Sequence, residues 1–579
     1  MDKAIDLSLD SDTEQHCSPT SPPSSEIIDV DERTGDCGSS ASGKRPCASV
    51  GTSEKKGNKR AKADGKGKGK CKDERKTRSP LFRLISTSHD GPGAGTVSME
   101  DLLSGDFTEL LLANFMIDIA FLLDAQPRLA SVPVVIVHGF EKGSEPAERL
   151  RNVALKINLG IKVHTPEVPN FGKHHGKLML IKFATGIRVI VTTANFIEYD
   201  TVGKSQGVWY QDFPRRQAEA CEFEDVLVDY VLRMGGPATP FARSLREYDF
   251  TSARVALVSS VPCTRPKHKG ADLYMYGHMR VRALLKEEPI SLEKGGHKVI
   301  FQFSSLAHLS ADPRKWLLEL LSSFMAEKKL EELGSSSSSS SFRAADPRHM
   351  LEEHLRIVWP TTESVRTSLL GWRSGGSIPC RTVDMFGGDF RRADERRFRE
   401  NKPKDELRPL LRKWEGREAL NREKAAPHIK TFLRYRETRE NGEARVDGDK
   451  LAWFLLTSSN LSRSAWGILD KTCKQLLLRS FEIGVMFLPS RLRCGGVRCS
   501  AEGLEFTCTP GRTGLTQRFP LAYVLDSEDS LPLELLPIPY HVPAPRYDFT
   551  KGDRPWVWDQ EYQTPDAFGT KWSPGGDTD

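Results

Sequence analysis

One ordered pattern of residues occurs twice in the chain, and this repeat restricts the fold more than any other feature. Each copy has a histidine, a lysine two positions later, an expected β-hairpin and then an asparagine. The six residues are His175, Lys177 and Asn195 in the first copy, and His428, Lys430 and Asn460 in the second. A repeated order of this kind arises by chance far less often than one copy does. The chain is therefore expected to consist of two related halves.

The residue types of each copy are suited to phosphate chemistry. Side chains at positions i and i+2 of a β-strand face the same side, so His175 and Lys177 are expected side by side. An imidazole can act as nucleophile or proton carrier, while lysine and asparagine donate to phosphate oxygens. Two such half-sites facing each other would hold one phosphodiester, which predicts phosphoryl transfer. A single His-x-Lys has little specificity, and His174, on the opposite face, is expected to be structural.

The hydrophobic pattern predicts an α/β protein. Met99–Ala125 has apolar residues at helical spacing, whereas Val132–Phe140 has the continuous apolar character of a buried strand. Residues 178–183 and 187–192 flank a short turn containing Gly186, and they are typical of a β-hairpin. Alternating helix and strand signals favour an α/β fold.

Other segments show where the chain is expected to be ordered. Residues 1–80 contain almost no aromatic residues and are expected to be disordered. A linker is indicated at 287–296, and the serine run at 335–341 reads as a flexible loop. A charged insertion at 436–449 is expected to interrupt the second hairpin. The aromatic residues of 555–562 indicate that the C-terminal part packs onto the body.

The net charge of +6 is unevenly placed. Residues 1–42 hold ten acidic and two basic residues, and residues 43–81 hold fourteen basic and four acidic ones. The basic stretch indicates nuclear import or loose phosphate binding, although a solvated tail has the same composition. The run Ile27–Val30 resembles a SUMO-interacting strand.

Composition also argues against several classes of protein. No stretch reaches the ~18–20 apolar residues of a membrane span, and the acidic N-terminus argues against a signal peptide. The eleven scattered cysteines indicate free thiols. Cys494, Cys499 and Cys508 lack a fourth ligand for a tetrahedral zinc site. We therefore expect neither a metal nor another cofactor.

The paired His-x-Lys motifs resemble the phospholipase D superfamily. That superfamily usually adds an aspartate five positions after the lysine, where this chain has Lys182 and Tyr435. The downstream asparagines instead resemble the tyrosyl-DNA phosphodiesterase branch, type 1, in a variant expected to be fungal-like. Further matching segments include QGVWYQDFP, YGHMRVRALL, VRTSLLGW, TSSNLSRSAWG and RPWVW, over residues 80–575.

The resemblance implies a fold and catalytic roles. The expected fold is α/β with two pseudo-symmetric halves, 81–290 and 291–579, each a mixed sheet flanked by helices, with one active site between them. In this family the first histidine is the nucleophile and the second protonates the leaving tyrosine and then activates water. The resemblance also implies that two further residues orient the histidines. The implied catalytic set is His175, His428, Lys177, Lys430, Asn195, Asn460, Gln206 and Glu482.

The resemblance also implies contacts with DNA. Phe171 matches the position that stacks on a base, while Ser377, Ser462 and Arg366 match positions that contact backbone phosphates. Ordinary loop capping and salt bridging are the alternatives for the last three. The chain departs from the pattern at 199–201, where a tryptophan is expected after the aspartate.

The implied function is hydrolysis of 3′-phosphotyrosyl bonds left by topoisomerase I, in the nucleus. The implied partners are single-stranded or end-frayed DNA bearing a 3′ adduct and a topoisomerase I-derived peptide, with SUMO or import receptors at the tail. A monomer without membrane association is expected. The alternatives are a phospholipase D-like lipid phosphodiesterase, which predicts membrane-binding elements, and an inactive DNA-end-binding protein, which predicts loss of motif residues.

Overall fold

A computed structural model describes most of the chain beyond residue 80. The described ranges are 81–90, 95–263, 267–288, 296–309, 312–326, 347–389, 392–393, 395–492, 531–532 and 536–574. The predictions for the N-terminal 80 residues, for the serine run and for the three-cysteine group lie outside these ranges, as does most of the expected linker.

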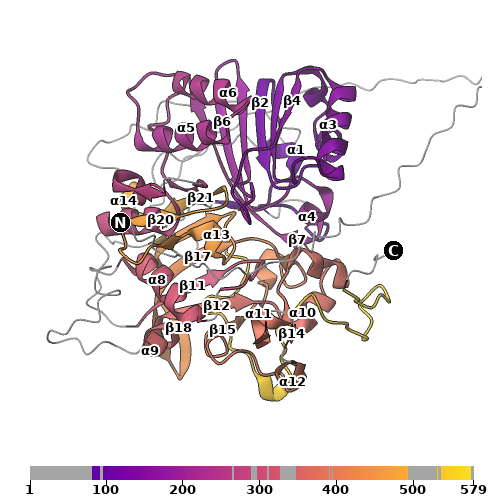
Figure 1. Ribbon diagram of the computed structural model, residues 1–579, viewed down its shortest axis with the longest axis vertical. Coiled ribbons are helices and arrows are strands. Elements are labelled where there is room, and N and C mark those ends of the chain that lie inside the picture. Colours follow the sequence, from indigo (N-terminus) through magenta and orange to yellow (C-terminus); the bar gives the residue numbers. More distant parts are fainter. Residues whose placement is uncertain are drawn as a thin grey trace, which may run out of the picture. The chain divides into compact units, whose positions relative to one another are not determined.

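A seven-stranded mixed sheet forms the first half (Figure 1). Its order is β1-β8-β6-β5-β2-β3-β4, with β2, β3 and β4 parallel and the other neighbours antiparallel. The strands are β1 (Arg83–Leu84), β2 (Phe107–Asn114), β3 (Val134–His138), β4 (Ile161–His164), β5 (Leu178–Phe183), β6 (Gly186–Thr192) and β8 (Gly207–Pro214).

Helices cover both faces of this sheet (Figure 1). Apolar residues of α1, α2 and α3 share one hydrophobic cluster with one sheet face, and those of α5 and α6 share another cluster with the opposite face. The bounds are α1 (Met99–Leu102), α2 (Ile119–Ala125), α3 (Glu145–Ile157), α5 (Glu222–Met234) and α6 (Ala238–Ser244).

The second sheet has the order β15-β12-β11-β17-β18-β21-β9, with β22 paired to β18. Its strands are β9 (Ala256–Ser260), β11 (His297–Gln302), β12 (Leu355–Trp359), β15 (Leu411–Lys413), β17 (Thr431–Glu440), β18 (Glu443–Thr457), β21 (Glu482–Phe487) and β22 (Leu531–Pro532). The helices α7 (Gly277–Glu287) and α8 (Pro313–Met325) pack on one face with a shared apolar cluster. The helix α9 (Pro347–His354) directly precedes β12.

The two sheets have the same topology. Strands β4, β3, β2, β5, β6, β8 and β1 correspond in order and direction to β15, β12, β11, β17, β18, β21 and β9. One hydrophobic cluster contains residues of both sheets, so the halves share part of their core. The predicted α/β fold with two pseudo-symmetric halves is confirmed. Since β9 precedes residue 290 but joins the second sheet, the division at that residue stays a prediction.

Short elements complete the described chain. They are α4 (Glu198–Val202), β7 (Lys204–Ser205), β10 (His268–Lys269), α10 (Thr362–Arg366), α11 (Thr382–Phe386), β13 (Gly388–Asp389), β14 (Arg392–Ala393), α12 (Glu395–Arg399), β16 (Ala426–Pro427), α13 (Arg463–Trp466), β19 (Ile468–Leu469), β20 (Gln475–Leu477) and α14 (Pro489–Leu492), with 3₁₀ turns such as Phe549–Lys551.

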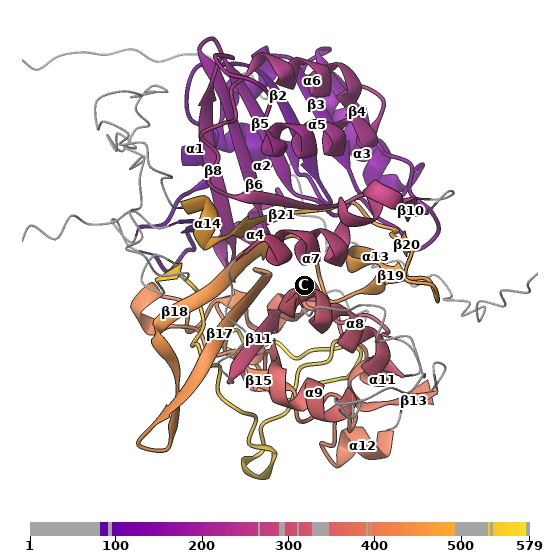
Figure 2. The same ribbon diagram turned by 90° about the vertical axis from the view of Figure 1, so that its left-hand side faces the viewer.

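Two sequence-based predictions of local structure were wrong. The helix expected over Met99–Ala125 is a short helix, the strand β2 and a second helix. An apolar run such as FTELLLAN fits a buried strand as well as a helix, and pairing with β3 and β5 selects the strand. The charged residues 436–449 extend the second hairpin into a long arm through a turn at Asn441 and Gly442 (Figure 2).

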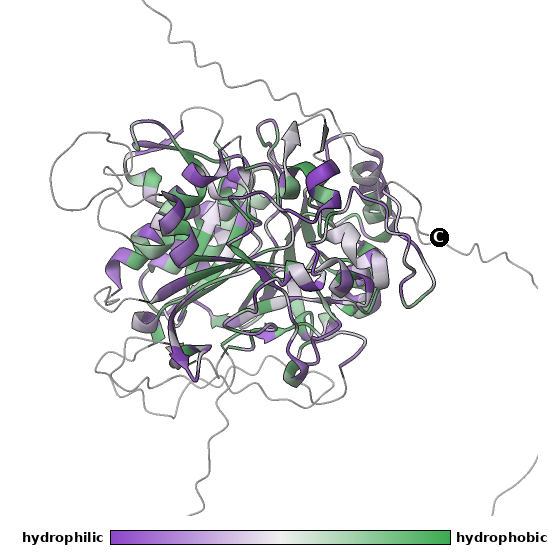
Figure 3. Cartoon of the chain, turned by 90° about the horizontal axis from the view of Figure 1, so that it is seen from below, coloured by the Kyte–Doolittle hydropathy of each residue, from purple (hydrophilic) through white to green (hydrophobic). Residues whose placement is uncertain are grey.

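Other predictions were right. The strand at 134–138 and the hairpin of β5 and β6 are present. Trp556, Val557 and Tyr562 are buried in the cluster under the second sheet, so the C-terminal aromatic segment packs onto the body. Hydrophobic residues concentrate in the interior strands, whereas hydrophilic ones prevail in peripheral loops and helices (Figure 3).

Membrane-spanning helices and disulfides are both absent from the described residues. None of the helices there combines the length and the apolar character that a bilayer span requires. The cysteines in that part of the chain, Cys221, Cys263, Cys380 and Cys473, form no disulfide.

Candidate active site

The two His-x-Lys segments lie directly before equivalent strands. His175 and Lys177 precede β5, and His428 and Lys430 precede β17, so the motifs are not within strands as predicted. In both copies the lysine Nζ donates to the backbone carbonyl of the histidine two residues earlier, at 2.9 Å for Lys177. The histidine and lysine therefore lie together, through this local hydrogen bond.

Each segment hydrogen-bonds to the other half of the molecule. The His175 backbone N–H donates to the Phe481 carbonyl (2.9 Å), and Phe481 lies directly before β21. Similarly, the His428 N–H donates to the Ser205 carbonyl (3.2 Å), and the short strands β16 and β7 pair in parallel. The two contacts are equivalent under the pseudo-symmetry. They bring the end of one half's motif against the residue preceding Gln206 or Glu482 of the other half.

The cross-half contacts pair each histidine with a polar residue of the opposite half. His175 Nδ1 lies 2.9 Å from Glu482 Oε2, and Gln206 Nε2 lies 2.8 Å from His428 Nδ1. Equivalent hydroxyls hold the two partners: Thr193 donates to Gln206 Oε1 (2.8 Å), and Ser458 donates to Glu482 Oε2 (2.5 Å). The predicted orienting residues, Gln206 and Glu482, therefore contact the histidines.

These partners assign opposite tautomers to the two imidazoles. The Glu482 carboxylate accepts, so His175 carries its proton on Nδ1 and leaves Nε2 as a free lone pair. The Gln206 Nε2 also donates to the Asp200 carbonyl (3.1 Å), which fixes this amide as a donor toward His428 Nδ1. Before substrate binds, neutral His428 then carries its proton on Nε2. The substitution of glutamate by glutamine between the halves is what distinguishes the two histidines.

Burial lowers the pKa values of both histidines and both lysines. Burial first, and then the charge of Lys177, lowers the pKa of His175 to about 4 despite the opposing carboxylate of Glu482. Burial likewise holds the pKa of His428 well below its usual value. The pKa of Lys177 is lowered to about 8 by burial, and burial together with Lys177 holds that of Lys430 far below its usual range. A phosphate anion placed between the two lysines would stabilise their charged forms.

The two asparagines are held differently. Asn195 donates from Nδ2 to Asp200 Oδ2 (2.8 Å), whereas Asn460 accepts at Oδ1 from the backbone N–H of Ser304 (3.1 Å). The Asn460 amide group therefore has its two N–H donors available for a phosphoryl oxygen.

Asp200 is a site residue for which sequence reasoning assigned no role. Its carboxylate is fully buried, forms an ion pair with Lys204 (2.6 Å) and lies 3.5 Å from His428 Nδ1. Burial alone would raise the pKa of Asp200, but the charges of His428 and Lys204 outweigh it and keep the carboxylate ionised. Asp200 thus contacts Asn195 of one half and faces His428 of the other. The segment 199–201, where the chain departs from the family pattern, was the available signal.

The predicted DNA-contact residues fall into two groups. Phe171 is exposed (55%), adopts φ of +63° and has the Arg479 guanidinium 5.6 Å from its ring centroid. A bulky residue in this left-handed region is uncommon, and the exposed ring suits stacking. Ser377 accepts from the Lys204 ammonium (2.5 Å), next to the site.

The other two residues, Ser462 and Arg366, have the alternative roles of capping and salt bridging. Ser462 caps α13 by accepting from the Ala465 N–H (3.2 Å), and Arg366 pairs with Glu363 and donates to the Pro565 carbonyl (2.8 Å). Their contacts with DNA stay predictions.

Residues near the motifs that were predicted to be non-catalytic occupy structural positions. His174 is buried against Phe481 with its ring centroid 5.4 Å away, and Lys182 pairs with Glu109 (2.6 Å). The Tyr435 hydroxyl donates to Glu437 (3.2 Å). Across the ranges given above, no cluster of three or more His, Cys, Asp or Glu residues is suited to hold a metal ion.

Most of the chain is similar to proteins of a known family. The family model described as tyrosyl-DNA phosphodiesterase matches residues 83–548. This chain belongs to the tyrosyl-DNA phosphodiesterase family. Tyrosyl-DNA phosphodiesterase 1 of Arabidopsis thaliana is 34% identical over 527 residues, covering 85% of this chain and 76% of the relative.

More distant relatives support the same family and fold. The probable tyrosyl-DNA phosphodiesterase of Schizosaccharomyces pombe is 23% identical, covering 71% of this chain and 82% of the relative. These identities do not favour a fungal variant over a plant one. The crystal structure of the yeast tyrosyl-DNA phosphodiesterase has a TM-score of 0.57 at 16% identity, covering 83% of this chain and all of that one. At this identity it shows the shared fold.

A substitution of Asp200 can show whether this residue acts on proton donation by His428 or only on folding. Asp200→Asn removes the charge facing His428, so we expect turnover of a 3′-phosphotyrosyl oligonucleotide to fall by about 10–100-fold, less than the ~10²–10⁴-fold that a general acid contributes in full, because His428 itself is retained. An oligonucleotide with a 3′-(4-nitrophenyl) phosphate should be affected much less, because nitrophenolate leaves without a proton.

The control for this prediction addresses the buried cation. Asp200→Asn leaves Lys204 unpaired, which costs about 3–5 kcal/mol of stability. The double variant Asp200→Asn/Lys204→Met should recover thermal stability but not tyrosyl turnover. Equal loss with both leaving groups would contradict the role given to Asp200.

Proposed function

We propose that this chain hydrolyses 3′-phosphotyrosyl bonds between DNA ends and topoisomerase I-derived peptides through a phosphohistidine intermediate on His175. The observation that carries this proposal is the cross-half pairing of His175 with Glu482 and of His428 with Gln206. It supports one imidazole as nucleophile and the other as proton carrier, beside two buried lysines.

In the first step, His175 Nε2 attacks phosphorus. The phosphorus–nitrogen bond forms as the bond to the tyrosine oxygen breaks, and protonated His428 transfers its Nε2 proton to that oxygen. Asp200 faces the imidazolium of His428, and the bound phosphodiester adds further negative charge that favours it. Lys177, Lys430 and Asn460 stabilise the charge on the non-bridging oxygens.

In the second step, His428 is neutral with its remaining proton on Nδ1, which faces Asp200 Oδ2, and its free Nε2 accepts a proton from water. The water oxygen bonds to phosphorus as the phosphorus–nitrogen bond breaks, which restores His175 and leaves a 3′-phosphate. The two-step path allows both displacements to use one fixed pair of imidazoles.

The proposal is tested by incubating the full chain in EDTA with an oligonucleotide bearing a 3′-phosphotyrosine. We expect conversion to a 3′-phosphate end, because the lysines supply the positive charge. A phosphatidylcholine substrate tests the lipid phosphodiesterase alternative. Absence of DNA conversion, or preferential lipid hydrolysis, would overturn the proposal, and DNA binding without conversion would favour the inactive end-binding protein.

The pKa values predict the pH dependence of kcat/KM, which reports the free enzyme. Because attack requires neutral His175, activity should fall as the pH drops through about 4. Activity should also fall as the pH rises, because the first step needs protonated His428, whose pKa burial lowers, and because Lys177, with a pKa of about 8, loses its charge. In kcat the alkaline limb should lie higher, since bound phosphate favours the charged lysine. Equal alkaline limbs in kcat and kcat/KM would contradict this account.

Localisation and binding partners are part of the proposal. The basic stretch 43–81 supports nuclear import, and the exposed ring of Phe171 supports base stacking with single-stranded or frayed DNA. The tail would recruit import receptors or SUMO, and one chain already holds both half-sites, which supports a monomer. A reporter fused to residues 43–81 that stays cytoplasmic would exclude the import role.

A further inference from the structure

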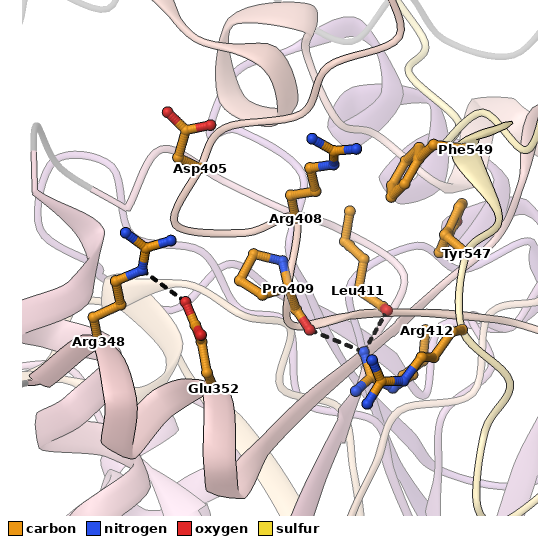
Figure 4. Close-up of a pocket in the computed structure, with 10 residues that line it drawn as sticks. Arg348, Glu352, Asp405, Arg408, Pro409, Leu411, Arg412, Tyr547 and Phe549 are labelled. Atoms are coloured by element: carbon orange, nitrogen blue, oxygen red, sulfur yellow. Dashed lines mark hydrogen bonds and ion pairs between the residues drawn. The ribbon is translucent and has the colours of Figure 1, made fainter.

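A cavity of about 440 Å³ lies at the edge of the second sheet, formed by residues to which the proposed reaction gives no role. Its walls come from α9, from the start of β15 and from the C-terminal segment 546–549. Figure 4 shows Arg348 and Glu352 on one side, Tyr547 and Phe549 on the other, and Arg408 beside the aromatic pair. The volume is within the range of small-ligand sites.

The charges around this cavity do not balance. Four arginines line it, together with two carboxylates. Glu352 pairs with Arg348 (2.7 Å), and Asp405 pairs with Arg397 outside the lining (3.0 Å). The remaining lining arginines form no ion pair within the described residues. They are Arg408, Arg412 and Arg546.

Arg412 is the buried member of this group. It is 5% exposed, and its Nη1 donates to the backbone carbonyls of Pro409 (3.0 Å) and Leu411 (2.7 Å). Arg356, also buried, adds a second cation beside it and likewise donates to backbone carbonyls. Burial, and then the charges of Arg356 and Arg546, lower the pKa of Arg412 to about 9, although the Glu437 carboxylate opposes them. An anion in the cavity would relieve this repulsion.

Guanidinium groups select the class of anion. Their planar fork binds phosphate in a bidentate manner, more strongly than it binds halide ions. A phosphate monoester carries about −1.5 to −2 charge near neutral pH, so one such group does not balance three arginines, whereas two linked phosphates do. Arg408 lies 5.1 Å from the centroid of the Phe549 ring, and Tyr547 stacks on that ring, so Phe549 already has two partners.

The cavity is separate from the catalytic histidines. It includes β15, and the sheet order places β12 and β11 between β15 and β17, the strand that follows His428 and Lys430. At about 4.8 Å per strand, β15 and β17 are about 14 Å apart. None of the catalytic residues lines the cavity.

We propose that this cavity is a binding site for a small anion with two linked phosphate groups, held by Arg408, Arg412 and Arg546. The bound anion stabilises the edge of the second sheet, where α9, β15 and the C-terminal segment meet.

Binding of inorganic pyrophosphate to the full chain tests this site, measured by calorimetry at constant ionic strength. The variant Arg408→Gln/Arg546→Gln alters two exposed side chains and leaves the buried Arg412 in place. We expect it to weaken binding at least tenfold, because charge-assisted hydrogen bonds contribute about 1.5–3 kcal/mol each. Arg149→Gln/Arg243→Gln removes two exposed arginines of the first half and is the charge-matched control. It should leave the affinity unchanged.

A second variant distinguishes the cavity from the active site, which also attracts phosphate. Lys177→Met/Lys430→Met, checked for folding by circular dichroism, should keep pyrophosphate binding. Loss of binding in this variant alone, equal weakening in the charge-matched control, or no saturable binding would each overturn the proposal. If the Arg408/Arg546 variant instead weakens duplex DNA binding while pyrophosphate fails to bind, the arginines contact a DNA backbone and the proposal is wrong.

Discussion

Replacing His175 by alanine is expected to reduce hydrolysis of a 3′-phosphotyrosyl oligonucleotide by at least ~10³-fold, the scale seen when a covalent nucleophile is removed. The physical reason is that His175 is the imidazole whose Nδ1 hydrogen is held by Glu482, which directs the Nε2 lone pair to phosphorus. Single-turnover product formation, followed on denaturing gels, measures the effect.

The neighbouring histidine provides the matched control. His174 is buried against Phe481, and His174→Leu places an apolar side chain in this apolar contact, so most of the activity should remain. If His175→Ala retained conversion while His174→Leu lost it, the nucleophile would be wrongly assigned.

Replacing His428 by asparagine is expected to trap the covalent DNA–protein adduct. The asparagine Oδ1 can still accept from Gln206, which preserves the local structure, but it cannot activate water as a base. A nucleophilic step with a good leaving group would proceed, so the phosphohistidine should persist about 10²–10⁴-fold longer. Labelled DNA that migrates with the protein after rapid mixing and acid-free denaturation measures it.

The double variant His175→Ala/His428→Asn is the control for the trapped species. It should form no adduct, because the nitrogen that bonds to phosphorus is missing. An adduct that still appears in this variant, or no adduct with His428→Asn at any time point, would contradict the proposed division of roles.

The repeat alone was enough to predict the architecture of the site. Two copies of His-x-Lys followed by a hairpin and an asparagine predicted two halves, and the strand orders of the two sheets confirm this. The sequence predicted secondary structure less well where an apolar run did not alternate with polar residues. FTELLLAN was predicted as helix because burial on both sides removes the periodicity that identifies a strand. The register of β2 with β3 and β5 decides it.

The role of Asp200 could not be predicted from spacing. Its five-residue distance from Asn195 allows a hydrogen bond in a tight turn, but its proximity to His428 depends on β7 pairing with β16 across the halves. The arginine cavity could likewise not be predicted from spacing, since Arg348, Arg412 and Arg546 are distant in sequence and meet at one sheet edge.

The sequence by itself determined which side chains carry the chemistry, because residue type and short spacing are properties of the chain. The tertiary structure decided which histidine meets which partner. His175 and Glu482 are 307 positions apart, and His428 and Gln206 are 222 positions apart. Such contacts require the two sheets to share a core. One partner is a carboxylate and the other an amide, so this pairing assigns the proton to opposite nitrogens of the two imidazoles and distinguishes nucleophile from acid.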